Sequence, residues 1–348
     1  MVGNRDRIVR VAPSAVVAAA GADKTGASAG VLEVEMVIRL HRLSITISFL
    51  ILALAISLSG CGKSEKNSIK TFATPDDAGN ALLAVAKAGD QTAIPTIFGP
   101  GSEQVILSGD SVEDKNGATS FVTRYGEMHR WRKLADGSQL LLVGADNYPF
   151  PIPLRKNAGG QWYFDTAAGK EELLNRRVGR NELALIDACR ALANAQAAYF
   201  SQLHDGARTK QYAVKFISDP GKQNGLYWQS STGEPQSPLG PLVAYATSEG
   251  YSAKPDAHVP FHGYYFHMLN GQTANATGGK KSYIVDGHMV GGFAFVAYPA
   301  EYGISGVMTF MINQNGVLLE KDLGKDTAKI ASAMREFDPD TSWRPVQE

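Results

Sequence analysis

An apolar run that ends at a cysteine divides this chain. Eighteen residues, from Leu43 to Gly60, carry no charge, and Cys61 follows them directly. Arg39 and Arg42 precede the run, so a basic start leads into an apolar segment that closes on small residues. This order is typical of a secretory signal peptide. We therefore expect the folded part of the protein to lie after Cys61.

The end of the run, Leu58-Ser59-Gly60-Cys61, resembles the lipobox of bacterial lipoproteins. The resemblance implies that residues 36–60 are a removed signal peptide and that Cys61 becomes a lipidated N-terminus, followed by a tether over residues 61–70. Acyl chains contribute roughly 0.8 kcal/mol per buried methylene, so this lipid is the expected link to the membrane. A run of this length can also nearly span a bilayer, so an uncleaved anchor, or a signal cleaved without lipidation, is the alternative.

The predicted location is the bacterial cell envelope, with the protein lipid-anchored and facing the periplasm. Gly62 favours the outer membrane, because lipoproteins retained in the inner membrane usually carry Asp at that position. Residues 1–35 are rich in Ala, Val and Gly and fit no part of a signal peptide. We interpret them as a mis-assigned extension upstream of a true start at Met36. A genuine N-terminal arm without a fold is the alternative.

Charge and composition exclude some classes of partner and scaffold. The formal net charge is zero and the pI is about 7.1, whereas a nucleic-acid-binding protein usually has a basic excess. The chain has only two cysteines, so a disulfide framework is not expected. Hydrophobic residues make up 44% of the 348 residues, which is enough to build the cores of two domains.

Residues 71–168 predict a first α+β domain. Thr74 and Pro75 are typical of a helix start, and Gly89-Asp90 of a helix end followed by a shorter helix. A third helix is predicted over residues 120–128. The period then changes to two, and four strands of a small antiparallel meander are predicted over residues 129–134, 138–144, 150–156 and 161–167.

Residues 169–348 predict a second α+β domain, built from one long helix on an antiparallel sheet. Apolar residues at helical spacing predict that helix over residues 182–204, with an extension back to Glu171 left open. Cys189 lies on its apolar face and is expected to be a buried, inert thiol. Asn315-Gly316 predicts a hairpin. The predicted strands cover residues 261–269, 281–287, 291–299, 306–313 and 317–323, before a last helix over 327–337.

Long segments of the chain resemble one bacterial family. The phrases "NGLYWQSSTGEPQSPLGPL", "PFHGYYFHMLNGQ", "GGFAFVAYPAEYGISGVMTFMIN" and "VLLEKDLG" look like domain-of-unknown-function family 2950. The resemblance covers nearly all of residues 70–348. It implies an exported envelope protein and no established activity.

The second domain is also similar, at a greater distance, to the globular part of type IV pilins and pseudopilins. The shared features are a long helix ending "AQAAYF" and a sheet closing with "GVMTFMINQNGVL". Two features depart from the pilin pattern. No prepilin cleavage site leads into the helix, and Arg176, Arg177 and Arg180 occupy the part that a pilin would place in the membrane. The resemblance therefore implies a pilin-like fold used as a recognition domain.

Histidines are the candidate catalytic or metal-binding residues. Four of them lie between residues 258 and 288, and imidazole is the commonest metal ligand. His262 and His267 have opposite parity on a predicted strand, however, so they face opposite sides. Asp286 could orient His288 for acid–base catalysis, although Asp286-Gly287 also favours a turn. No cofactor or metal is expected. His262, Asp286 and His288 remain candidates for an enzyme site.

A dense aromatic set is the candidate binding face. Amphipathic rings suit interfaces, so Tyr227, Trp228, Tyr264, Tyr298 and Tyr302 are the candidate residues for binding a glycan or a peptide. Packing within the sheet and loops is the alternative for these rings. We predict a non-enzymatic binding or scaffolding lipoprotein whose partners are the membrane, through Cys61, and an envelope protein or glycan. The alternative is a cell-envelope hydrolase, or another enzyme, that uses the His/Asp set.

Overall fold

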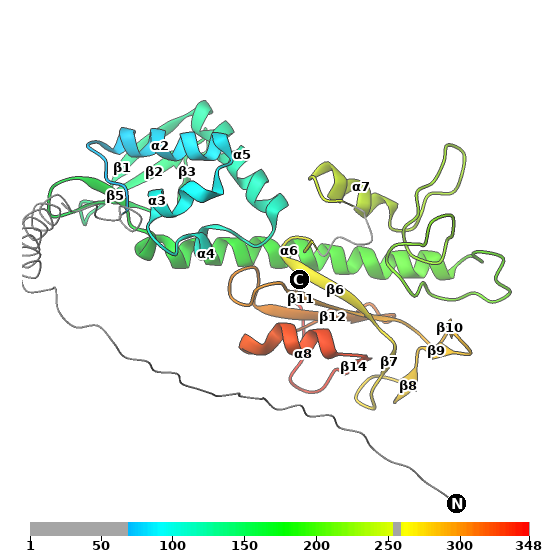
Figure 1. Cartoon of the computed structure of the whole chain (residues 1–348). Helices are drawn as coiled ribbons and strands as arrows, with labels where there is room; N and C mark the ends of the chain where they lie inside the picture. Colours follow the sequence, from blue (N-terminus) through cyan, green and yellow to red (C-terminus); the bar gives the residue numbers. More distant parts are fainter. Residues whose placement is uncertain (1–68, 253–258, 348) are drawn as a thin grey trace, which may run out of the picture. The chain divides into compact units, whose positions relative to one another are not determined.

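A computed structural model describes residues 69–252 and 259–347 of the chain (Figure 1). The predicted extension (1–35), the signal peptide (36–60) and the lipidated Cys61 lie outside the described residues. Within the described part, no helix is long and apolar enough to cross a bilayer. Helices combine with mostly antiparallel sheets, so the α+β prediction is confirmed.

Helices come first along the described chain, as the capping signals predict. The Thr74 side chain accepts a hydrogen bond from the Asp77 N–H, and the Asp77 carboxylate accepts one from the Thr74 N–H, which starts α2 at Pro75. Gly89 ends this helix with φ of 62°, a left-handed conformation that favours glycine. The helices of this part are α2 (Pro75–Ala88), η2 (Gln91–Ala93), α3 (Ile94–Phe98), α4 (Glu103–Ile106) and α5 (Ser111–Glu127).

The helix predicted over residues 120–128 is longer than expected. It is the second half of α5, which begins at Ser111. The Asp110 carboxylate caps that start, because it accepts hydrogen bonds from the backbone N–H groups of Val112 and Glu113. The first turns of α5 are largely polar, so apolar periodicity misses them.

The first sheet is an antiparallel meander in the order β1-β2-β4-β5, with β3 paired to β2. Residues 150–156 were predicted as one strand, but only the last three of them are in a strand. Pro151 and Pro153 interrupt the pairing, because proline lacks the N–H that a sheet requires. The strands are β1 (His129–Lys133), β2 (Gln139–Val143), β3 (Tyr148–Pro149), β4 (Leu154–Lys156) and β5 (Trp162–Phe164).

A single helix, α6 (Thr166–Phe200), connects the two halves of the described chain. It begins earlier than predicted, because the Asp165 side chain caps it by accepting from the Ala168 N–H. Leu173, near its start, packs against the hydrophobic cluster of the first half, whereas Leu185 and Cys189 belong to the cluster of the second half. The predicted domain boundary at residues 168/169 therefore falls in the first turn of α6. Cys189 is buried as predicted, and burial raises its pKa to about 12.

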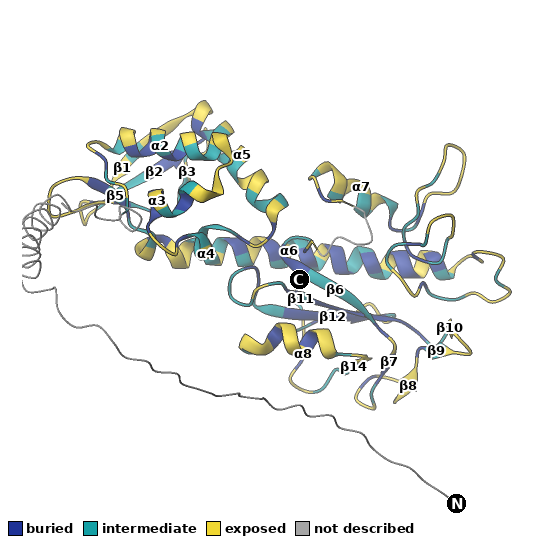
Figure 2. Ribbon diagram, viewed as in Figure 1, coloured by how far each residue is buried: buried dark blue, intermediate teal, exposed yellow. Residues whose placement is uncertain are grey.

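The second sheet lies against α6 in the order β15-β13-β12-β11-β6, and all its pairs are antiparallel. A smaller sheet has the order β14-β7-β8, and β9 pairs with β10. Figure 2 shows the buried residues on the middle of α6 and on the central strands. These elements are α7 (Gly240–Ser248), β6 (Tyr264–Leu269), β7 (Gly271–Gln272), β8 (Lys281–Ser282), β9 (Ile284–Val285), β10 (His288–Met289), β11 (Ala294–Pro299), β12 (Met308–Asn313), β13 (Leu319–Asp322), η3 (Gly324–Asp326), α8 (Thr327–Ala333), β14 (Glu336–Phe337) and β15 (Arg344–Pro345).

Two local predictions in this half need correction. The β12–β13 hairpin forms as predicted, but its loop covers residues 314–318 instead of 314–316. Of the pair Asn315-Gly316, only Gly316 has a positive φ. The last helix ends at Ala333 instead of Phe337. Glu336 and Phe337 form β14, which pairs with β7, so pairing with a distant segment overrides the local helical pattern.

Two glycines of α6 are expected to respond oppositely to alanine. A Cβ on the buried Gly169 would lie 2.6 Å from the Ile152 Cα, so G169A should lower the free energy of unfolding by about 1–3 kcal/mol. Gly179 has nothing within 4 Å of such an atom, so G179A should raise it by about 0.5–1 kcal/mol. Urea unfolding of both variants checks this, and equal changes would contradict the close approach at Gly169.

Candidate functional site

A cavity of about 1110 Å³ lies beside α5 and α6. Its walls come from α2, α3, α5 and α6, from the segment around Phe150, and from Glu249, Tyr251 and His262. These segments are far apart in the sequence. The volume lies slightly above the usual range for small-molecule sites, about 300–1,000 Å³.

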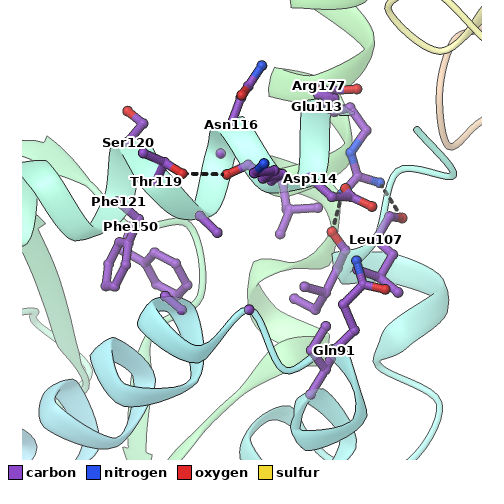
Figure 3. A pocket seen from close by; sticks show the side chains of 18 of the residues that line it. Gln91, Leu107, Glu113, Asp114, Asn116, Thr119, Ser120, Phe121, Phe150 and Arg177 are labelled. Carbon is purple, nitrogen blue, oxygen red and sulfur yellow. Dashed lines mark hydrogen bonds between the residues drawn. The ribbon is translucent and has the colours of Figure 1, made fainter. Parts of the chain in front are cut away.

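One end of the cavity is apolar and aromatic. The rings of Phe121 and Phe150 lie 5.7 Å apart, and Figure 3 shows them side by side. They belong to a set of partly buried hydrophobic residues that pack on the first hydrophobic cluster and also line the cavity. This set is Val85, Ile106, Leu107, Phe121, Phe150 and Leu173. The first core is therefore incompletely covered on its cavity side.

The other end of the cavity is charged. The buried Arg177 guanidinium donates hydrogen bonds to the carbonyls of Val105, Ile106 and Leu107, at 3.0, 2.6 and 3.1 Å. It thereby satisfies carbonyls at the C-terminal end of α4. Glu113 and Asp114 lie at the same end (Figure 3), and burial raises the pKa of both carboxyls. The pKa of Arg177 is lowered by burial, although the two carboxylates oppose that effect.

A buried carboxylate ties the cavity wall to the second half of the chain. One oxygen of Asp110 caps α5, and the other accepts hydrogen bonds from the Tyr251 hydroxyl at 2.7 Å and the Gly263 N–H at 3.3 Å. Asp110 is fully buried, and the helix start and these donors compensate its charge. Burial, with Asp110 as a second cause, strongly raises the pKa of the Tyr251 hydroxyl, which therefore remains a donor.

His262 and Glu249 form a pair at the cavity edge. The His262 Nε2 and Glu249 Oε2 atoms are 3.1 Å apart, which is an ion-pair distance when the imidazole is protonated. The angles between them do not meet those of a hydrogen bond, and neither atom has another hydrogen-bond partner although both are buried. His262 also adopts a positive φ of 47°. The next residue, Gly263, leads into β6.

Comparison with known proteins identifies the family. The family model described as protein of unknown function (DUF2950) matches residues 69–346. The chain belongs to the DUF2950 family. This confirms the resemblance drawn from the sequence. No curated protein and no solved structure matches the chain, so the likeness to pilins stays a prediction from the sequence pattern.

The predicted histidine and aspartate set is not assembled in this DUF2950 chain. Of the three candidates, only His262 lines the cavity. Asp286 and Gly287 have positive φ values of 50° and 81° and form the turn between β9 and β10. This is the turn that the sequence favours as the alternative to a catalytic role. His288 follows the turn, and its Nδ1 lies 2.8 Å from the Gln211 side chain. Within residues 69–252 and 259–347, no three His, Cys, Asp or Glu side chains gather as a metal site.

The five aromatic candidates lie in several environments, and none of them lines the cavity. Tyr264 is 0% exposed, and its hydroxyl donates to the Met308 carbonyl, so it is a core residue and not part of a surface. Tyr227 and Trp228 are half-buried against the second core. Tyr298 packs on Tyr265 and His267. Tyr302 donates to the Asp322 carboxylate.

The sequence does not reveal the cavity, because the residues that line it follow ordinary core patterns. Phe121 and Phe150 lie in segments whose apolar spacing predicts only a helix and a strand. Arg177 and Asp110 belong to no sequence motif that indicates a binding site. Phe121 and Phe150 sit among predicted core positions, so no local signal distinguishes a side chain that faces a cavity from one that faces a filled core.

His267 is expected to make the protein acid-sensitive. Burial lowers its pKa below 6.5; its hydrogen bond to the Met334 carbonyl opposes this, and the Arg335 charge adds to it. Because the folded state disfavours the protonated imidazole, this stability is present above pH 6.5 and is lost as the pH falls through the folded pKa. Urea unfolding at pH 7.5 and 5.5 should show a smaller loss in H267Q than in the wild type. Equal losses of unfolding free energy in H267Q and the wild type would contradict the role assigned to His267.

Proposed function

We propose that this protein is a lipid-anchored binding protein of the bacterial cell envelope, which holds a ligand in the cavity and does not transform it. The observation that carries the proposal is the cavity itself, where apolar side chains of the first core remain uncovered beside convergent charged groups. A large apolar pocket with a few polar groups is the usual form of a ligand site. The basic, apolar and small-residue order that ends at Cys61 supports the lipid anchor.

Binding is favoured over catalysis by the placement of the reactive groups. The Asp286 and His288 side chains do not line the cavity. The His262–Glu249 pair does line it, but the cavity wall presents no cysteine, and Ser120 and Thr119 lie towards the aromatic end (Figure 3). A nucleophile and a base within hydrogen-bond reach would be needed for covalent hydrolysis. The His262–Glu249 pair is therefore assigned to polar contacts with a bound molecule.

The test compares what the purified protein carries from its host. Ala86 lines the cavity on α2, whereas Ala84 is exposed on the same helix and does not. A solvent extract of the wild-type protein and of A84W should contain a compound that is at least tenfold depleted from A86W. Equal extracts from all three proteins would reject the binding proposal. Intact mass of the membrane-extracted protein tests the anchor, for which a chain starting at acylated Cys61 is expected.

A further inference from the structure

We infer that the ligand is an anionic amphiphile, with an acyl chain along the apolar end of the cavity and a carboxylate or phosphate head at Arg180. The inference rests on the proposed function and adds the chemical class of the ligand. It follows from the nature of the cavity walls, from the hydrogen bonds that each lining arginine already makes, and from where the described chain begins.

The walls offer apolar contact and few backbone hydrogen bonds. Most of them are helices, whose N–H and C=O groups bond within the helix except near the ends. A peptide that adds to a sheet needs a free strand edge, whereas strands contribute only Val143 of β2 and Tyr148 of the two-residue β3 to this lining. The six partly buried apolar residues named above instead supply side-chain contacts that need no fixed orientation. An acyl chain, which has no hydrogen-bonding groups, matches that surface.

The charge of the lining favours an anion. Six basic side chains line the cavity against four acidic ones, an excess of two positive charges. Three of the arginines have strong partners. Arg177 binds three carbonyls, Arg176 binds Glu172 at 2.6 Å and the Pro149 carbonyl, and Arg124 binds Asp146 at 2.7 Å.

Arg180 is the lining arginine with donors to spare. Among the described residues it has one ion pair, with Glu113, which is long at 3.5 Å, and 60% of its side chain is exposed. A guanidinium has five N–H donors and binds carboxylate or phosphate in a bidentate manner. Burial raises the pKa of Glu113, which weakens its competition for Arg180 with an incoming anion.

The start of the described chain suggests two sources for the acyl chain. Ile69 lies 3.6 Å from the Cβ position of Gly99, and the Lys70 N–H donates to the Thr96 carbonyl of α3. Ile94 and Phe98 of the same helix line the cavity. A separate membrane lipid with an anionic head is the source that fits the inference. Acyl groups on Cys61, which would carry no free carboxylate or phosphate, are the alternative that the experiment tests.

The experiment uses the full-length protein in membranes of the producing cells. The probe is a long-chain fatty acid with a diazirine near the end of its chain, and its neutral alcohol is the matched control. After irradiation, the labelled peptides are located by mass spectrometry. We expect acid-dependent label within residues 82–88 and 118–121. The label should fall at least tenfold in A86W and in a second cavity-filling variant, A118W, and remain in A84W.

A separate variant, R180Q, tests the assignment of the head group to Arg180. R180Q should reduce labelling by the acid about tenfold, to the level of the alcohol, because it removes a charged hydrogen-bond donor. Unchanged labelling in A86W and A118W, or equal labelling by acid and alcohol in the wild type, would overturn the inference. Stronger label in Cys61→Ser would show that the protein's own acyl groups, which carry no free carboxylate or phosphate, fill the site, and it would overturn the anionic head group. Unchanged label would support a separate anionic lipid.

Failure of the inference is distinguishable from failure of the proposed function. If the extract of the wild type holds a cavity-dependent compound without an acyl chain, and the probe does not label the cavity, only the ligand class is overturned. If the extracts of wild type and A86W are equal and no label is found, both proposals are rejected.

Discussion

Replacement of Asp110 by alanine is expected to lower the free energy of unfolding by roughly 3–7 kcal/mol. The substitution removes the cap of α5 and leaves the Tyr251 hydroxyl and the Gly263 N–H without an acceptor. A lost cap contributes about 1 kcal/mol, and each buried donor left unsatisfied about 1–3 kcal/mol. Urea unfolding followed by tryptophan fluorescence measures the loss.

Two further variants separate the roles of the Asp110 oxygens. Asparagine also caps helices, so D110N should keep the cap of α5 and lose only the contacts of the other oxygen. In the Tyr251→Phe background, D110A should be less destabilising than in the wild type, because the hydroxyl is already gone. Additive losses in that double-mutant cycle would contradict the proposed link between Asp110 and Tyr251.

Replacement of Arg177 by methionine is expected to destabilise the protein to a similar degree, by about 3–5 kcal/mol. Methionine fills much of the same space but donates no hydrogen bond. The carbonyls of Val105, Ile106 and Leu107 would lose their donor. The half-buried Glu113 and Asp114 would lose the cation that opposes the rise in their pKa. Urea unfolding at pH 7.5 checks the effect.

Arg180 provides the matched control for Arg177. It lies three residues further along α6 and is largely exposed, so R180M should change the free energy of unfolding by no more than about 0.5 kcal/mol. R177K should recover only part of the loss, since an ammonium group cannot reach three carbonyls as a planar guanidinium does. If R177M and R180M behave alike, the role assigned to Arg177 is wrong.

Local signals in the sequence predicted the parts of the fold that depend on a few neighbouring residues. Thr74-Pro75 starts α2 where expected, and Asp286-Gly287 forms the turn between β9 and β10. Such signals work because capping and backbone dihedral preference act within one turn of chain. The errors arose where distant contacts intervene, as at Glu336-Phe337, which pairs with β7 instead of continuing α8.

The candidate site could be predicted only in small part. His262 was singled out for its chemistry and does line the cavity, but its partner is Glu249 and not Asp286 or His288. The density of aromatic residues in the sequence predicts a binding face, and Tyr264 shows why density alone is insufficient. Alternation along a strand says that its ring points to one face, but not that α6 and the sheet cover that face completely.

The sequence by itself determined the family, the α+β class, the start of α2 and the segment that ends at Cys61, because each is carried by contiguous residues. Only the tertiary structure decided that Asp110 meets Tyr251, that Arg177 serves α4, and that Phe121 and Phe150 face a cavity. Those contacts join residues from 29 to 141 positions apart. Their formation depends on how whole elements pack. Periodicity within one element does not indicate which element will pack against it.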